Sequence, residues 1–377
     1  MTTKPQHGVF PTTDLTIGDI AFDYSSLNRM SLYLSENQHD ALVIHVNGLP
    51  PKSVTQLHGK PVYLKMTVSG ACQVFAGYVA DVRPESSSSF GLMNKSPFQQ
   101  VEVICMGASY RMRGSRSRSW NGYRLSDIAK DMAYTYGFDL DAPNDSSIHP
   151  ALLQTNESDW QFLTRYANDL GYSVNVHGTH MHVYDPYKAL SRQNSVYRLT
   201  TIIGGKSPAV TSPGQILEFT GTFSHRHIDG DYKRADIPVI NPVNSVYDVA
   251  SSAGRAQFPH RSPEFADNYA EAQRRLGVLA KNRYDYYADV RVVGIVSCVP
   301  GGVVLVDKYE GEFDKYWYVQ EVKHTVHSDA FFTDLKIARN INSELKNTNT
   351  KRLSRKLKSE YRGGAWLSPS RSALVYE

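Results

Sequence analysis

The stretch ESDWQFLTRYANDLGY, residues 157–172, decides how the rest of the sequence is interpreted, because it predicts a capped helix with several large rings. Ser158 and Gln161 match a capping box, and Gly171 is a typical helix stop. Apolar side chains at helical spacing form two adjacent strips, namely Trp160, Leu163, Ala167 and Leu170 on one and Phe162 and Tyr166 on the other. A face this wide predicts burial on both strips, so we expect the helix to be wedged between two domains or subunits.

Residues 114–187 around this helix are predicted to form a small α+β module. RLSDIAKDMAYTYGF, residues 124–138, predicts a first helix that ends at Gly137. YSVNVHGTHMHVYD, residues 172–185, predicts a β-hairpin with its turn at Gly178. The module should therefore contain two helices and one hairpin.

Five arginines and no carboxylate occur in RMRGSRSRSWNGYR, residues 111–124, at the start of this module. Such a stretch suits contact with phosphate, a membrane surface or an acidic partner. It is equally typical of a solvated basic loop. The sequence alone leaves both interpretations open.

The sequence on both sides of the module predicts β-structure. PVYLKMTV, CQVFAGYVADVR and QVEVICMG before the module, and DVRVVGIV and KYWYVQEVKHTVH after it, are alternating or continuously apolar runs separated by turn residues. The predicted fold class is therefore α+β, mainly β. Two antiparallel β domains, residues 1–113 and 188–342, are expected on either side of the module.

One helix is predicted inside the second β domain, over residues 263–283. Its apolar stripe follows a Ser-Pro start and contains Phe265, Tyr269 and Leu276. Such a stripe is usually a core face or a contact with a partner helix. The segment before it, residues 231–262, is spaced by prolines and is predicted to be irregular.

Positive charge is concentrated near the end of the sequence. The chain carries +4, whereas residues 343–377 contain eight Lys or Arg and three Glu, so the remaining residues carry −1. This stretch has no apolar periodicity and is predicted to be a basic arm, with Lys351, Arg352, Arg355, Lys356 and Lys358 at its centre. A nucleic-acid-binding protein would more often carry its basic surface on the folded part.

Hydropathy and cysteine usage exclude further classes of protein. No run of about 18 apolar residues occurs, so no membrane insertion is predicted. Cys72, Cys105 and Cys298 are odd in number, lack metal-ligand spacing and lie in strand-like runs. We expect buried free thiols in a protein made in a reducing cytoplasm.

Histidines of the predicted hairpin are the best candidates for a metal site. His180 and His182 share one strand face with His177 across the turn, and His225 and His227 form a second pair. A zinc site needs a third or fourth ligand and an outer shell, so a surface hairpin rich in polar rings is the simpler interpretation. No GxSxG, P-loop or HExxH motif and no distinctive carboxylate pair occurs, so neither catalysis nor a cofactor or metal is predicted.

QTNESDWQFLTRYANDLGY also resembles a segment of phage tail baseplate hub proteins. That family includes the late-control-protein-D group of contractile phages and the N-terminal part of the VgrG spike proteins of type VI secretion. Residues 124–138 resemble the helix that precedes the segment in the family, and YWYVQEVKHTVHSDAFFTDLKIAR, which begins at Tyr316, resembles its closing strands. The resemblance runs in order from about residue 20 to residue 342.

The resemblance implies two tail-tube-like antiparallel β-barrels per chain, with the small module between them and no catalysis. Three chains of that family form a ring. The implied partners are two further copies, the tail tube or distal tail protein, a tip or spike protein and the tape-measure protein, with DNA only in transit. The implied location is the virion, in the tail baseplate or tip, after synthesis in the cytoplasm of the bacterial host.

The side chains predicted to pack at interfaces within or between chains come from both predicted stripes, namely Trp160, Phe162, Leu163, Tyr166, Leu170, Phe265, Tyr269 and Leu276. Two other functions remain open. One is a cell-wall hydrolase carried at the tail tip, and the other is a VgrG-like component of type VI secretion. The VgrG pattern continues into an OB domain and a β-helical spike, which we do not expect here.

Overall fold

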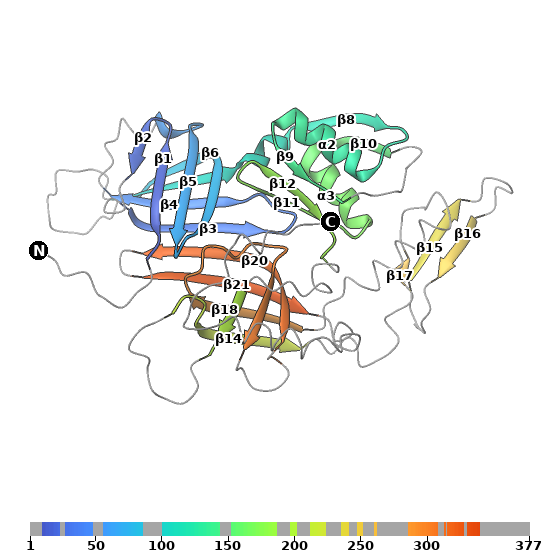
Figure 1. Ribbon diagram of the computed structural model, residues 1–377. Coiled ribbons are helices and arrows are strands. Elements are labelled where there is room, and N and C mark those ends of the chain that lie inside the picture. Colours follow the sequence, from blue (N-terminus) through green and yellow to red (C-terminus); the bar gives the residue numbers. More distant parts are fainter. Residues whose placement is uncertain are drawn as a thin grey trace, which may run out of the picture.

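The computed structural model shows a mainly β protein with a small helical module (Figure 1). The structure describes residues 10–22, 27–47, 56–85, 100–143, 152–186, 197–201, 212–223, 235–240, 247–251, 260–261, 286–307, 313, 315–327 and 330–339. None of the helices in these ranges has the length and apolar run that crossing a lipid bilayer requires. The predicted α+β, mainly β fold class is confirmed.

A single sheet of 13 strands contains strands from both predicted β domains. Its strands before the module are β1 Thr12–Ile17, β2 Ile20–Phe22, β3 Leu27–Ser35, β4 Ala41–Asn47, β5 Pro61–Val68, β6 Ala71–Glu85 and β7 Gln100–Gly107. Those after the module are β13 Tyr197–Thr200, β14 Ile216–Phe223, β18 Tyr286–Val293, β19 Val303–Asp307, β20 Tyr316–His327 and β21 Phe331–Arg339. The main path runs β14-β18-β21-β20-β3-β4-β7-β6-β5-β1-β2.

The two β regions join where β3 pairs with β20 in antiparallel orientation, with Met30 opposite Val326 and Leu34 opposite Val322. Figure 1 shows the blue strands of the first region lying beside the orange strands of the second. Alternation explains why the sheet has one buried face, since every second residue of β5 is buried. One apolar core accordingly contains residues of both regions, from Leu15 to Ile337.

The module lies beside the sheet (green in Figure 1) and has a core of its own. Its elements are η2 Ala108–Arg113, β8 Ser115–Trp120, α2 Leu125–Tyr136, β9 Asp139–Asp141, β10 Leu152–Ser158, α3 Asp159–Asp169, β11 Ser173–His177 and β12 His180–Tyr184. The predicted helices and hairpin are confirmed, as are the capping box of Ser158 and Gln161 and the left-handed Gly137 after α2. Strands β8 and β10, which pair with each other, were not predicted.

Residues 111–124, for which the sequence left two interpretations open, contain the end of η2 and all of β8, and most of their side chains are exposed. Other local predictions are wrong. The segment 231–262, expected to be irregular, contains β15 Ala235–Ile240, β16 Tyr247–Ser251 and β17 His260–Arg261, which form a separate small sheet. Cys105 and Cys298 are buried free thiols as predicted, but Cys72 is exposed, and Cys298 lies between β18 and β19 rather than in a strand.

Some predictions lie outside the described residues. They are the helix over 263–283 with Phe265, Tyr269 and Leu276, the histidines His225 and His227, and the basic arm with Lys351, Arg352, Arg355, Lys356 and Lys358.

Candidate assembly surfaces

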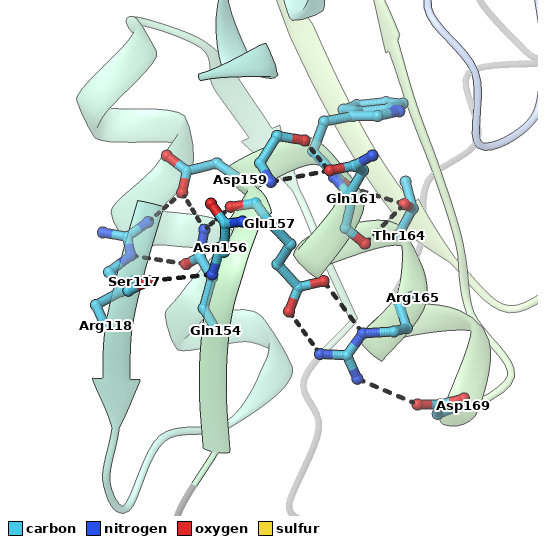
Figure 2. Close-up of polar contacts among 12 residues, drawn as sticks. Ser117, Arg118, Gln154, Asn156, Glu157, Asp159, Gln161, Thr164, Arg165 and Asp169 are labelled. Carbon is cyan, nitrogen blue, oxygen red and sulfur yellow. Dashed lines mark hydrogen bonds and ion pairs between the residues drawn. The ribbon is translucent and has the colours of Figure 1, made fainter. Parts of the chain in front are cut away.

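A buried carboxylate at the first residue of α3 holds the module together. Asp159 is fully buried and accepts hydrogen bonds from Arg118 at 3.0 Å, from the Gln154 amide at 2.8 Å and from the Tyr136 hydroxyl at 2.7 Å. Arg116 lies 3.6 Å from its second oxygen. Figure 2 shows Arg118, Gln154 and Asp159 converging where β8, β10 and α3 meet. A buried charge is tolerated when it is paired and hydrogen-bonded in this way.

Three of the five arginines of residues 111–124, namely Arg113, Arg116 and Arg118, have structural partners in the module. The Arg118 guanidinium lies 4.2 Å from the ring centroid of Trp120, and that of Arg113 lies 4.4 Å from the ring of Tyr110. Stacking on a ring and pairing with a carboxylate fix the planar guanidinium in place. Arg116 pairs with Asp159, and Arg118 pairs with both Asp159 and Asp131. These two arginines are therefore not a free site for phosphate.

A second group of charges near α3 lies at the surface. Glu157 accepts two hydrogen bonds from Arg165, at 2.7 Å and 3.2 Å, and Arg165 also lies 4.0 Å from Asp169 (Figure 2). The Arg165 side chain is 43% exposed, so water screens these pairs, and they are worth little to stability.

The apolar strips of α3 pack against the module's own elements. Phe162, Leu163, Tyr166 and Leu170 are buried in one cluster with residues of α2, β8, β11 and β12. The Phe162 ring stacks on Trp120 and on Tyr166, each at 6.1 Å between centroids. With exposed fractions of 3% or less, these four side chains have little surface left for another chain. The elements that cover these side chains belong to the module itself.

Trp160 is the member of the predicted set that reaches beyond the module. Its ring is 4.8 Å from the ring of His39, which lies in the turn between β3 and β4 of the large sheet. The His39 Nδ1 lies 2.8 Å from the Ser109 hydroxyl of η2, and its ring packs edge-on against Tyr110. Residues Glu36 to Asp40, here called the docking turn, thus hold the module against the sheet.

Other residues of the docking turn contact other elements of the module. The Asn37 backbone N–H donates to the Val174 carbonyl of β11, and the Val174 N–H donates back to the Asn37 side chain, both at 2.9 Å. Asp40 lies 2.9 Å from the Nδ1 of His177. Burial raises the pKa of Asp40, and the neighbouring His177 counteracts this in part.

Glu36 at the start of the turn joins three parts of the chain. The Tyr184 hydroxyl of β12 donates to its carboxylate at 2.9 Å, and the Tyr318 hydroxyl of β20 also donates to it. Burial raises the pKa of Glu36, while hydrogen bonds from Tyr318, Ser173 and Tyr184 oppose the rise. Nothing in the sequence ENQHD marks this turn, because its partners come from distant segments.

The hairpin histidines that were metal candidates each face a carboxylate instead. His177 pairs with Asp40, while His180 lies 3.5 Å from Asp139 and His182 lies 3.6 Å from Asp141. Among the described residues, no three His, Cys, Asp or Glu side chains are placed to hold a metal ion. The carboxylates on β9 were not predicted as partners of these histidines, because neither β9 nor its parallel pairing with β12 was predicted.

The outward face of the large sheet is continuous across the junction of the two β regions. Cross-strand partners, which point to the same side, form one row over nine strands. The row is Pro61, Tyr78, Met106, Ala41, Tyr33, Lys323, Asp334, Arg291 and Glu218. Its first half is mainly aromatic and apolar and its second half is charged.

Charges on the second half of this face neutralise one another. Arg291 lies 2.7 Å from Asp334 and 3.3 Å from Glu218, and Lys336 lies 2.7 Å from Glu321. The Lys323 ammonium lies over the ring of Tyr33. These residues line a hollow of about 440 Å³ on the face. Alternating signs give the surface little net attraction for a polyanion.

The same chain path occurs in solved tail proteins. A tail protein from Neisseria meningitidis MC58 is similar with a TM-score of 0.64 and 14% identity, over 88% of this chain and 97% of that one. The 43 kDa tail protein of prophage MuSo2 from Shewanella oneidensis gives 0.61 and 13%, over 87% and 98%. The chain has the fold of phage tail proteins.

This tail-protein fold is also found in a secretion component. The E. coli c3393 protein, a component of the type VI secretion system, is similar with a TM-score of 0.56 and 11% identity, over 87% of this chain and 77% of that one. No protein-family model matches the sequence, and no curated protein matches it significantly. At these identities the likeness shows the fold, and the function has to be argued from the surfaces described above.

Proposed function

We propose that the chain is a structural hub of a phage tail baseplate or tail tip, in which three copies form a ring around the channel. The observation that carries the proposal is the single sheet whose outward face continues across both β regions. Three such faces side by side would enclose a channel. The tail-protein fold supports the same role.

Two strand edges in the described part of the chain suit ring closure. At one end of the path, β14 pairs only with β18. Near the other end, β6 pairs with β5 only as far as Tyr78 and continues along β7 to Glu85. Pro84 has no N–H, and the Val82 N–H donates to the Asp81 side chain at 2.9 Å, so another strand would pair with Asp81–Arg83 by displacing that contact. Unpaired edges favour pairing with another chain.

The charge pattern of the face fits a channel that DNA passes through without being held. Each arginine or lysine that traps phosphate slows transit, because phosphate neutralisation dominates nucleic-acid affinity. Here Arg291 and Lys336 are already paired with carboxylates on the same face. The tape-measure protein, the tail tube or distal tail protein and a tip or spike protein would be the neighbours of such a ring in the virion.

The first test is the mass in solution. Light scattering after size-exclusion chromatography should give three times the chain mass of 42.3 kDa. A cysteine at Asp81 or Arg83, combined with one at Glu218, Thr220 or Thr222, should give disulfide-linked trimers on a non-reducing gel. The exposed Cys72 has to be replaced by Ser in all variants, whereas Cys105 and Cys298 are buried.

A matched pair controls for chance collisions. Cysteine at Tyr134, which is 88% exposed on α2 of the module, combined with cysteine at Thr220 should give no trimer band. A chain that is monomeric at every concentration tested would count against the hub. Equal cross-linking of the control pair would count against this arrangement of edges.

We further propose that the hub is not an enzyme. A tail-tip hydrolase would give a clearing band on a peptidoglycan zymogram that one carboxylate substitution abolishes. We expect no band from the purified chain, and a band of that kind would overturn the structural role. The fold likeness to the type VI secretion component keeps a VgrG-like role as the second candidate, which co-purification with a spike protein of such a system would favour.

A further inference from the structure

The module and the sheet have separate apolar cores. The core of the sheet and the core of the module share no residue, and the small cluster between them consists of Tyr184, Val303 and Tyr318 with Tyr316 beside it. Contacts of the docking turn across this boundary are mainly polar. Interfaces of this kind between parts of one chain allow relative motion more readily than apolar ones do.

Two residues of the docking turn, His39 and Glu36, have opposite effects on docking when they bind or release a proton. His39 is enclosed by Trp160, Ser109 and Tyr110 of the module. The carboxylate of its neighbour Asp40 is turned to His177, and the Arg113 guanidinium lies over the ring of Tyr110. The enclosure therefore favours the neutral imidazole. Glu36 lies at the other end of the turn, between Tyr184 and Tyr318.

We propose that the docking turn is a proton-operated joint. Uptake of a proton by His39 releases the module from the sheet as the pH falls, and loss of the proton from Glu36 releases it as the pH rises. Module and sheet each keep their fold in the released state. This property belongs to the single chain and does not depend on the proposed ring.

The release caused by proton uptake at His39 follows from the linkage between proton binding and docking. Burial lowers the pKa of His39 from 6.5 to about 4. A depressed histidine pKa means that the released state binds more protons below pH 6.5, so release rises as the pH falls. For this pKa difference the released fraction should rise about tenfold between pH 7.5 and pH 5.5.

The effect of Glu36 on docking has the sign opposite to that of His39. The pKa of Glu36 is raised by burial, so the docked state holds its proton more firmly than the released state. Docking through Glu36 is complete at low pH and is lost as the pH rises through the raised pKa. Burial also raises the pKa of Asp40, which therefore has the same sign as Glu36. Wild type shows the sum of these effects, so His39 is tested in a background that carries both Glu36→Gln and Asp40→Asn.

Hydrogen–deuterium exchange of the full chain tests the joint, with rates corrected for the chemical effect of pH. The reporters are the amides of Asn37 and Val174, which bond across the boundary. In the Glu36→Gln, Asp40→Asn background, exchange at both amides should rise about tenfold from pH 7.5 to pH 5.5. With His39→Gln added to this background, it should change less than twofold, because glutamine takes up no proton.

His180→Gln in the Glu36→Gln, Asp40→Asn background is the matched control. His180 is in the same hairpin, its side chain is 61% exposed and it faces Asp139. It should leave the tenfold rise unchanged. Equal exchange at both pH values in this background would overturn the proposal. So would simultaneous opening of α2 and α3 amides, which would mean that the module unfolds instead of detaching.

Discussion

Asp159→Asn should lower the free energy of unfolding of the small module by about 3 kcal/mol, one of the largest effects that a single substitution has in this protein. The new amide would face the donors of Arg118 and Gln154, and it cannot accept as two carboxylate oxygens do. Arg116 and Arg118 are 48% and 28% exposed and can regain water, so we expect the lower end of the usual range of about 3–5 kcal/mol. Urea unfolding followed by the fluorescence of the module tryptophans measures the loss.

Glu157→Gln is the matched control for this prediction. It also removes one carboxylate beside α3, but Glu157 pairs with the half-exposed Arg165. Its effect should stay below about 1 kcal/mol. If both variants lost the same amount of stability, the buried position of Asp159 would not be the source of the effect.

Trp160→Ala should destabilise the module by about 3–5 kcal/mol and weaken its attachment to the sheet. The ring is 5% exposed, and truncation removes both its packing inside the module and its contact with His39. Denaturant unfolding gives the stability, and exchange at the Asn37 amide gives the attachment. Trp160→Phe keeps a ring in place and should cost clearly less. A stable, assembled Trp160→Ala chain that had lost a catalytic activity would instead indicate an active site at α3.

Local signals predicted local structure well. Ser158 and Gln161 are three residues apart and fix the start of α3, and Gly137 fixes the end of α2, because capping depends on neighbouring backbone groups. The spacing of Phe162 and Tyr166 likewise predicted burial correctly. It did not reveal which surface covers them, and the module itself turned out to do so.

Contacts between distant segments escaped prediction. Nothing in the sequence around Asp159 indicates that Arg118 and Tyr136 will approach it. The docking turn has no motif. The pairing of β3 with β20 could not be foreseen either, because alternation identifies a strand but not its neighbour.

The pairing of β3 with β20 also constrains how the chain can be made. Glu36 and its partner Tyr318 are 282 residues apart. During synthesis, β3 therefore cannot pair with β20 until almost the whole described chain has left the ribosome. Until then its apolar face and one hydrogen-bonding edge stay uncovered. Such non-local closure is slow and favours aggregation of unfinished chains. Premature termination between the two β regions should therefore yield an insoluble fragment rather than a folded half.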